Sequence, residues 1–300
     1  MSNFFSEKVF KEIKKFESET TSKKNFLQKN ECIELLDYFR NLKNKSIGKS
    51  KSVDREESTK IFFDFNQSEL LKKLRIKIEE NVGEFFVNDF QPHMITCRYP
   101  LRLHIDTGKN PNDVIYKNVV VPLEIIYDLK QSMHKPPNSM VFKNKWYNES
   151  ALLTKHTNSK YDFIIKDFNN NFVDIINILD FKEKIQNIYN ETFSYDGKKF
   201  LVNQKFKEYI DNLSKTKRYN IRTDKHIVNN KDFDKNDYEK YMTHQPYEDC
   251  RSLEIDKVIS WDIGSLIYWD RTRIHCSDNF LRSNVISKTF VALFTSKTKI

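Results

Sequence analysis

The sequence predicts a protein of the α+β class that is mainly β, with helices flanking an antiparallel sheet. Apolar residues recur at helical spacing in the first 80 residues or so and again in the middle of the chain. Strand-like runs fill residues 93–147 and return at 257–295. They do not alternate regularly with helices, which excludes a simple parallel sheet of strand-helix units.

Three amphipathic helices are expected before the sheet, in residues 6–16, 30–42 and 68–80. Asn30 and Ser68 are the candidate caps of the second and third helices, because their side chains can accept hydrogen bonds from a first helical turn. These helices are expected to support one face of the sheet.

The expected strands fall into two groups separated by a long segment. This segment, residues 149–255, is rich in Asn and Lys, with helices expected near 174–189 and 204–213. We interpret it as an insertion within the sheet. Gly264 is expected to form a tight turn between two strands of the second group. The strands are expected at residues 93–106 (bent at Pro100), 118–126, 140–147, 257–261, 265–269, 273–277 and 288–295.

The composition indicates a folded chain with a sizeable core. Of the 300 residues, 38% are hydrophobic, which argues against disorder of the whole chain. A net charge of +9 permits contact with anions and does not exclude nucleic acid. Acidic residues are interleaved with the basic ones, however, so a solvated surface is the preferred interpretation, and no zinc-finger, helix-turn-helix or RNA-binding aromatic pattern is present.

The cysteines and the N-terminus suggest a cytoplasmic protein. The four cysteines are far apart and form no C-x-x-C pair, so neither a zinc finger nor a disulfide framework is expected. The first residues lack the apolar stretch of a secretory signal, and no apolar run reaches about 18 residues. We therefore expect reduced thiols and no membrane partner.

A histidine and a carboxylate two positions apart are the strongest candidates for chemistry. His104 and Asp106 lie in the strand-like segment RLHIDTG, and residues two apart on a strand share a face. Both side chains can therefore bind one metal ion, with Ile105 packed behind them. A second histidine would complete a two-histidine, one-carboxylate set, which leaves coordination positions open and suits non-haem ferrous iron.

His275 is the best candidate for the third ligand. On its expected strand it shares a face with polar residues while Ile274 and Cys276 face the other way. A closed antiparallel double sheet can bring it near Asp106. Lys288 begins the last strand on an otherwise apolar face, where a cation requires an anionic partner unless it is exposed. The other five histidines lack a partner at ligand spacing and are expected at the surface or in turns: His93, His134, His156, His226 and His244.

These motifs together resemble the iron(II)/2-oxoglutarate-dependent dioxygenase superfamily. The shared order is H-x-D at His104, a late His275 and a basic residue entering the final strand. The helix FLQKNECIELL resembles the opening helix of prolyl-hydroxylase-like members, and DRTRIHCSDNF resembles viral and marine microbial members. The resemblance covers residues 26–147 and 256–296.

The resemblance implies a double-stranded β-helix (jelly-roll, cupin-like) core in a single domain. Residues 1–84 would be the helical support, 85–148 and 256–300 the core, and 149–255 the insertion. It also implies that His104, Asp106 and His275 bind Fe(II), and that 2-oxoglutarate chelates the iron while its 5-carboxylate meets Lys288, or alternatively Arg282. Further candidates for contact with co-substrate or substrate are Arg98, Tyr99, Arg102 and Arg273, with core or structural ion-pair roles as the alternative.

The expected activity is hydroxylation of an unactivated C–H bond with O2, releasing succinate and CO2. The alternatives are a non-redox cupin-like isomerase or sensor that keeps the metal ligands but makes no use of Lys288, and a basic binding module in which the motif is coincidental. The substrate, a small molecule or a protein residue, and the oligomeric state are left open by the sequence.

Overall fold

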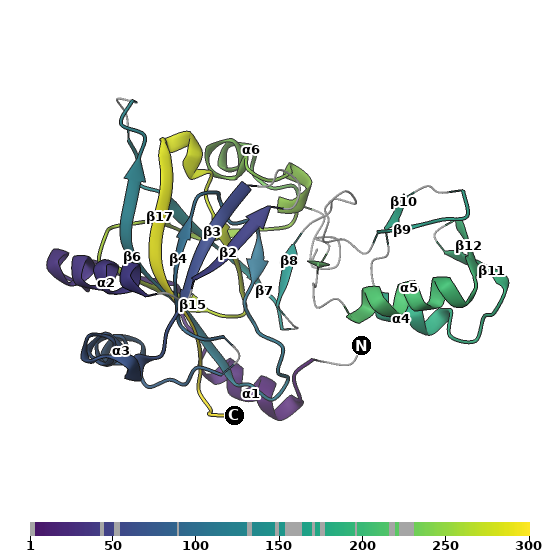
Figure 1. Cartoon of the computed structure of the whole chain (residues 1–300), viewed down its shortest axis with the longest axis horizontal. Helices are drawn as coiled ribbons and strands as arrows, with labels where there is room; N and C mark the ends of the chain where they lie inside the picture. The colour runs from purple at the N-terminus through teal and green to yellow at the C-terminus, as the bar shows by residue number, and fades with distance from the viewer. Residues whose placement is uncertain are drawn as a thin grey trace.

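The computed structural model is a mixed α+β structure with two large, mainly antiparallel sheets (Figure 1). The helices that the sequence predicted at the N-terminus lie outside the two large sheets. The structure describes residues 4–42, 45–50, 55–88, 90–130, 134–147, 150–153, 164–169, 172–174, 178–195, 197–215, 220–221 and 231–300.

The larger sheet has seven strands in the order β1-β15-β6-β17-β4-β3-β2, all paired antiparallel. Its long central strands β6 and β17 were predicted from sequence, and their positions are confirmed. The bounds are β1 (Thr21–Lys23), β2 (Lys45–Ser50), β3 (Arg55–Phe62), β4 (His93–Cys97), β6 (Ile115–Tyr127), β15 (Leu266–Asp270) and β17 (Val285–Ser296).

The smaller sheet has six strands in the order β13-β8-β5-β16-β7-β14, antiparallel except for the β13–β8 pair. The sequence predicted one bent strand over residues 93–106. The structure divides this segment into β4 and β5, which belong to different sheets, so the bend is a crossing between sheets. The bounds are β5 (His104–Ile105), β7 (Asn138–Lys145), β8 (Ala151–Leu153), β13 (Asn220–Ile221), β14 (Ile255–Ser260) and β16 (Arg273–Ser277).

Three helices precede the sheets, as predicted: α1 (Glu7–Lys15), α2 (Lys29–Asn41) and α3 (Glu69–Val82). Ser68 caps α3 by accepting a hydrogen bond from Leu71 N. The predicted Asn30 cap is wrong, because α2 begins at Lys29 with Gln28 as its N-cap, and Glu31 accepts the N–H of Gln28 in a capping box.

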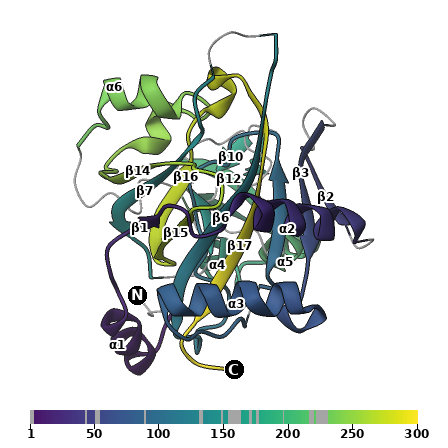
Figure 2. The same cartoon turned by 90° about the vertical axis from the view of Figure 1, so that its left-hand side faces the viewer.

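Apolar side chains from α2 and α3 cover the outer face of the larger sheet. Leu35 and Phe39 of α2 and Leu71 and Leu74 of α3 belong to one buried cluster with residues of β6, β15 and β17. Figure 2 shows both helices lying across this sheet. A second cluster fills the space between the two sheets, so the inner faces of the sheets pack on one another: Ile95, Cys97, Val120, Val141, Ile259, Trp261, Ile267, Trp269, Phe290 and Ala292.

Gly264 forms the tight turn predicted between β14 and β15. Its φ of +75° is in the left-handed region, and a Cβ there would collide with the carbonyl oxygen of Leu27. The carbonyl oxygen of Gly264 also accepts a hydrogen bond from Leu27 N, and its N–H donates to the carbonyl oxygen of Pro122. The turn therefore fixes the start of α2 against the sheet.

The middle segment contains a small group of elements with its own core. Its helices and hairpins lie away from the two sheets in Figure 1. Their apolar side chains form a separate cluster that includes Phe181, Phe200 and Ile210. The predicted division of the chain into support, core and insertion stays a prediction. The elements are β9 (Ile164–Lys166), β10 (Phe172–Asp174), α4 (Ile178–Lys184), β11 (Glu191–Tyr195), β12 (Lys198–Val202) and α5 (Gln204–Lys215).

After this group, short helical turns return the chain to the smaller sheet. They comprise α6 (Lys235–Asp237), a π-helical turn (Tyr238–Met242) and a 3-10 turn (Tyr247–Cys250). Met242 and Cys250 pack against the outward-facing residues of β5, β7 and β16. None of the described helices has the length and apolar character needed to cross a lipid bilayer.

Candidate metal centre

Strands β5 and β16 bring the two predicted histidine ligands directly opposite each other. His104 and His275 are Cα partners in the antiparallel pairing of these strands. Ile105 and Ile274 turn the other way, into the cluster behind the sheet, as alternation predicted. Asp106 follows β5 immediately, so its side chain points to the same side as His104.

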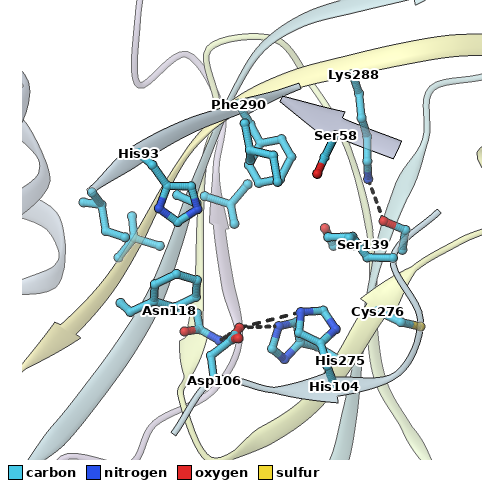
Figure 3. Close-up of a pocket in the computed structure, with 18 of the residues that line it drawn as sticks. Ser58, His93, His104, Asp106, Asn118, Ser139, His275, Cys276, Lys288 and Phe290 are labelled. Atoms are coloured by element: carbon cyan, nitrogen blue, oxygen red, sulfur yellow. Dashed lines mark hydrogen bonds and ion pairs between the residues drawn. The ribbon is translucent and has the colours of Figure 1, made fainter. Parts of the chain in front are cut away.

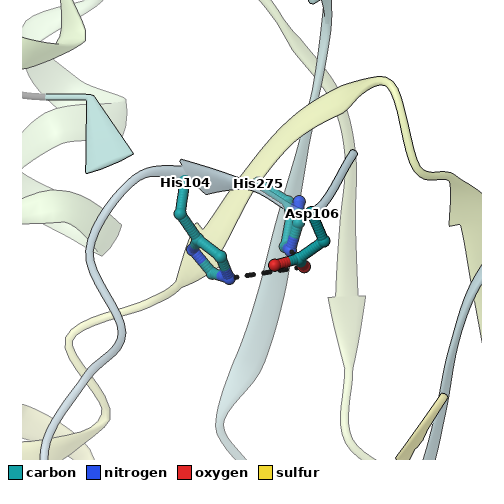
Figure 4. A group of neighbouring side chains, drawn as sticks. All are labelled: His104, Asp106 and His275. Carbon is teal, nitrogen blue, oxygen red and sulfur yellow. Dashed lines mark ion pairs between the residues drawn. The ribbon is translucent and has the colours of Figure 1, made fainter. Parts of the chain in front are cut away.

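The three side chains converge tightly enough to hold one metal ion (Figure 4). Asp106 Oδ2 lies 2.9 Å from His275 Nε2 and 3.7 Å from His104 Nε2. The ring centroids of the two histidines are 4.1 Å apart. All three ligand atoms lie within 4.8 Å of one another. Two nitrogens and one oxygen therefore surround a single point, as the sequence predicted.

Backbone hydrogen bonds orient both imidazoles toward that point. His104 Nδ1 lies 2.7 Å from the carbonyl oxygen of Arg102, and His275 Nδ1 lies 3.0 Å from that of Arg273. A carbonyl oxygen only accepts, so each Nδ1 carries the hydrogen and donates it. The lone pair of each neutral ring is then on Nε2, which faces Asp106. This is the tautomer that a metal ligand requires.

The electrostatics of the group favour a neutral His104 imidazole and an ionised Asp106 carboxylate. Burial, together with the neighbouring His275, lowers the pKa of His104 to about 4. Burial alone would raise the pKa of Asp106, but His104 and His275 lower it below its usual range. Asn118 Nδ2 donates to Asp106 Oδ2 at 3.2 Å, and Arg271 Nε donates to the Asp106 carbonyl at 2.8 Å. These contacts hold the carboxylate in place.

The group lies on the wall of a cavity of about 280 Å³ between the sheets (Figure 3). Its size is near the lower end of the usual range for small-molecule sites, roughly 300–1,000 Å³. The remaining walls are largely apolar. The lining includes Ile95, Leu101, Val120, Trp261, Trp269, Phe290, Ala292 and Phe294.

Lys288 of β17 reaches into this cavity across from the metal ligands. Its Nζ donates to Ser277 Oγ at 2.9 Å and lies over the rings of Trp261 (3.8 Å to the centroid) and Phe280 (5.1 Å). Among the residues that the structure describes, none forms an ion pair with it. Burial lowers the pKa of Lys288 to about 8. A buried cation is therefore available to an anion inside the cavity.

Arg282, the alternative to Lys288, lies outside the cavity. It is exposed on a turn, where its Nη1 donates to the Glu239 carbonyl at 2.5 Å and to Thr243 Oγ1 at 3.3 Å. The turn directs the guanidinium toward the π-helical segment and away from Ser277. The prediction that Arg282 could contact the co-substrate is therefore corrected.

Arg98 and Tyr99 also lie apart from the metal ligands. They line a separate hollow, and Arg98 Nη1 donates to Thr59 Oγ1 at 3.1 Å. Arg98 is an even number of residues from His104, so regular strand alternation would place both side chains on one face, but the chain crosses between the sheets after β4. In β4 it is Ile95, not its even-numbered neighbours, that faces the cavity.

Arg273 shares the strand of His275 but faces a different set of residues. Its guanidinium pairs with Asp256 at 3.0 Å and lies 3.6 Å from Asp270. The pairing of β16 with β7 is irregular between Arg273 and His275, so the two side chains do not share a face. Arg273 is thus a structural ion-pair residue, the alternative that the sequence left open.

His93 is the residue that sequence reasoning missed most clearly. It was expected at the surface or in a turn, but it is buried on the cavity wall between the rings of Phe62 and Phe294. The sequence indicated this only through spacing, because His93 is two residues from Ile95 on β4 and therefore shares its face. His134 and His244 lie outside the metal group and contact backbone carbonyls, whereas His156 and His226 lie outside the described residues.

No family model matches the chain, and no curated protein matches its sequence. Solved structures, however, are similar over nearly its whole length. The epimerase SnoN, in complex with Fe3+, alpha ketoglutarate and nogalamycin RO, is 10% identical with a TM-score of 0.40, covering 96% of this chain and 83% of that one. The non-heme alpha ketoglutarate dependent carbocyclase SnoK of nogalamycin biosynthesis is 9% identical, with a TM-score of 0.41 and coverage of 98% and 86%. A prolyl-4-hydroxylase of Pseudomonas putida is 9% identical, with a TM-score of 0.37 and coverage of 97% and 100%.

Proposed function

We propose that this protein is an Fe(II)- and 2-oxoglutarate-dependent oxygenase whose two sheets form a double-stranded β-helix, the jelly-roll core of cupin-like proteins. One observation carries the proposal. Two imidazole Nε2 atoms and a carboxylate converge on a cavity that also contains Lys288, a buried cation to which the described residues supply no carboxylate partner.

The ligand set fits ferrous iron. Two histidines and one carboxylate on one side of a metal leave the other side open, which suits non-haem Fe(II) and its co-substrates. Two polar groups of the cavity lining, Asn118 Oδ1 and Trp269 Nε1, are buried and have no hydrogen-bond partner among the described residues. Buried polar atoms without partners are unusual, so they support a polar ligand beside His275.

The position of Lys288 fits the far carboxylate of 2-oxoglutarate. Lysine serves here as a point charge, and Ser277 Oγ, its hydrogen-bond partner, can also reach a carboxylate oxygen. When bound, iron and 2-oxoglutarate supply the oxidation of a C–H bond by O2, with release of succinate and CO2. The apolar walls, including Phe290 and Trp261, exclude water from this reaction.

The residues of this chain contribute position and charge. The Arg102 and Arg273 carbonyls fix the imidazole tautomers, and Asn118 holds the carboxylate of Asp106. We propose hydroxylation as the reaction, because largely apolar walls surround the metal ligands and would hold a C–H bond beside them. A non-redox isomerase or sensor that does not bind 2-oxoglutarate would leave the buried charge of Lys288 without an anionic partner.

The test is anaerobic titration of the purified protein with Fe(II) and then 2-oxoglutarate, followed by measurement of succinate after oxygen is admitted. We expect both ligands to bind, and slow succinate formation even without a substrate. His275→Ala should abolish iron binding, whereas the matched control His134→Ala, at an exposed turn, should not change it. A wild-type protein that binds Fe(II) but not 2-oxoglutarate would instead support the non-redox alternative.

A further inference from the structure

The cavity contains more positive charge than iron and 2-oxoglutarate need. Besides Lys288, two cationic side chains line it: Lys60 of β3 and Arg102 before β5. Lys60 is half-buried, and Arg102 is exposed at the opening. Within the described part of the chain, neither forms an ion pair, and the only carboxylate in the lining is Asp106. The negative charges of Asp106 and of the co-substrate are used by the metal and by Lys288, so Lys60 and Arg102 have no anionic partner in the cavity lining.

The excess positive charge follows from the formal charges of the cavity residues and of the ligands that the proposed function assigns to it, so it rests on that function. Fe(II) brings two positive charges and Lys288 one, while Asp106 brings one negative charge and 2-oxoglutarate two. These charges cancel. Lys60 and Arg102 remain, and unpaired cations beside a largely apolar cavity attract an anion.

The register of the larger sheet separates Lys60 from Lys288. Lys60 is paired with Ile95, and Ile95 with Phe290, whereas Lys288 is paired with Cys97 in the next row. The two lysines are two strand spacings apart across the sheet and two residues apart along it. Their Cα atoms are therefore roughly 12 Å apart. One carboxylate held by Lys288 and Ser277 therefore leaves Lys60 free for a second ligand.

Alternation directs Lys60 toward the cavity. Its strand neighbours Ser58 and Phe62 share its parity, and Ser58 lines the same cavity while Phe62 packs on His93. The intervening Ile61 turns outward into the cluster beneath the helices. Lys60 and His93 line the same cavity, and the charge of Lys60 acts with burial to lower the pKa of His93 to about 4.

We propose that Lys60 and Arg102 form a receptor for the anionic group of the substrate, which is a small acid with an apolar body. The guanidinium of Arg102 supplies a fork for two oxygens, and Lys60 supplies a point charge. The apolar residues of the same cavity lining hold the hydrocarbon part, which presents its C–H bond to the iron site. Ile95, Leu101, Phe290 and Phe294 are among these residues.

The experiment uses three probes of similar shape: phenylacetate, phenyl phosphate and the neutral phenylacetamide. Each is titrated calorimetrically into the anaerobic protein saturated with Fe(II) and 2-oxoglutarate. We expect at least one of the anions to bind about tenfold or more tightly than the amide. Comparison of the two anions shows whether the receptor prefers carboxylate or phosphate.

Substitutions of Lys60 and Arg102 test whether the preference for an anionic probe depends on these two side chains. Lys60→Met and Arg102→Met should each reduce the affinity for the preferred anion about tenfold, while leaving 2-oxoglutarate affinity unchanged. Arg102→Met retains the backbone carbonyl that orients His104. The charge-matched controls Lys72→Met, on the exposed face of α3, and Arg282→Met, outside the cavity, should change neither affinity.

The outcomes separate this proposal from the proposed function. If 2-oxoglutarate binds but the anions bind no better than the amide, the receptor is disproved and the oxygenase proposal stands. The receptor is also disproved if Lys60→Met weakens 2-oxoglutarate as strongly as Lys288→Met does. If 2-oxoglutarate does not bind at all, the oxygenase proposal fails. An anion preference that depends on Lys60 in that protein would still establish the receptor.

Discussion

Lys117 and Lys288 lie on neighbouring strands and are almost equally buried, at 2% and 1% exposure, but their polar partners among the described residues differ. Lys117 Nζ forms an ion pair with Asp270 and donates to Ser18 Oγ at 2.7 Å and to the Phe16 carbonyl at 2.9 Å. Among the described residues, Lys288 contacts one hydroxyl group and two aromatic faces and has no ion-pair partner. Within that part of the chain, one cation is compensated by an anion and the other is not.

The difference distinguishes a structural charge from a ligand-binding charge. Asp270 also lies 3.6 Å from Lys145 and from Arg273, so Lys117 belongs to a network that attaches the segment after α1 to the sheets. Burial lowers the pKa of both lysines, and Asp270 opposes the shift for Lys117. The described residues supply an anion for Lys117 and none for Lys288, which is why the proposed function assigns Lys288 to a ligand.

The largest effect is expected from Lys117→Met. The substitution leaves Asp270 buried without its nearest cation and releases two hydrogen bonds to the N-terminal segment. Removal of one partner from a buried ion pair costs about 3–5 kcal/mol of unfolding free energy. Urea denaturation measures this loss. The double variant Lys117→Met/Asp270→Asn should lose less than the sum of the single variants; additive losses would show that the pair does not act as a unit.

Lys288→Met should have the opposite profile. We expect 2-oxoglutarate affinity to fall about 30-fold or more, because a buried carboxylate would lose its cation. Unfolding free energy should stay equal or increase, since the substitution removes an uncompensated buried charge. Calorimetry and urea denaturation measure the two effects on one sample. A loss of stability as large as that of Lys117→Met would contradict the comparison between the two lysines.

The sequence predicted the metal ligands because strand alternation is a local rule. His104 and Asp106 are two residues apart, and Ile274 and Cys276 flank His275, so parity alone assigned all three to inner faces. The principal strands were predicted for the same reason. Lys288 was identified through its place on an apolar strand face, and its burial is confirmed.

Strand alternation gave wrong side-chain directions where the chain leaves a regular strand. Arg98 and Arg102 have the same parity, yet the crossing between the sheets places only Arg102 at the cavity. The irregular pairing of β16 with β7 likewise separates Arg273 from His275. His93 and Lys60 were missed because their role depends on which strands lie side by side. Spacing within one segment carries no such information.

The pH dependence of 2-oxoglutarate binding should distinguish Lys288 from an ordinary surface lysine. With a pKa of about 8 in the free protein, Lys288 loses its proton as the pH rises above that value. Affinity should then fall roughly tenfold per pH unit above about 8, until the pKa of the complex is reached. Calorimetric titrations between pH 7 and pH 9.5 or so measure the slope, and Lys288→Met should abolish it. A wild-type affinity that is flat across this range would remove Lys288 from the co-substrate site.

The same shift has a consequence for stability, with its sign fixed by linkage. The pKa of Lys288 is lower in the folded protein than the 10.5 of an ordinary lysine, so between about 8 and 10.5 the unfolded chain binds more protons. Unfolding free energy therefore increases with pH across this window, relative to Lys288→Met. Urea denaturation of both proteins at several pH values measures the difference. Parallel pH profiles would show that Lys288 is not desolvated as the structure indicates.

Arg282→Met should have the smallest effect and is the sharpest control for position. Arg282 is closer to His275 in sequence than Lys288 is, but its guanidinium contacts a backbone carbonyl and a hydroxyl on an exposed turn. We expect 2-oxoglutarate affinity to stay within about twofold of wild type and unfolding free energy to fall by no more than about 1 kcal/mol. Calorimetry and urea denaturation measure both quantities. If Arg282→Met reduced 2-oxoglutarate affinity as much as Lys288→Met, an exposed cation outside the cavity would matter as much as a buried one within it. The comparison of compensated and uncompensated lysines would then have no functional meaning.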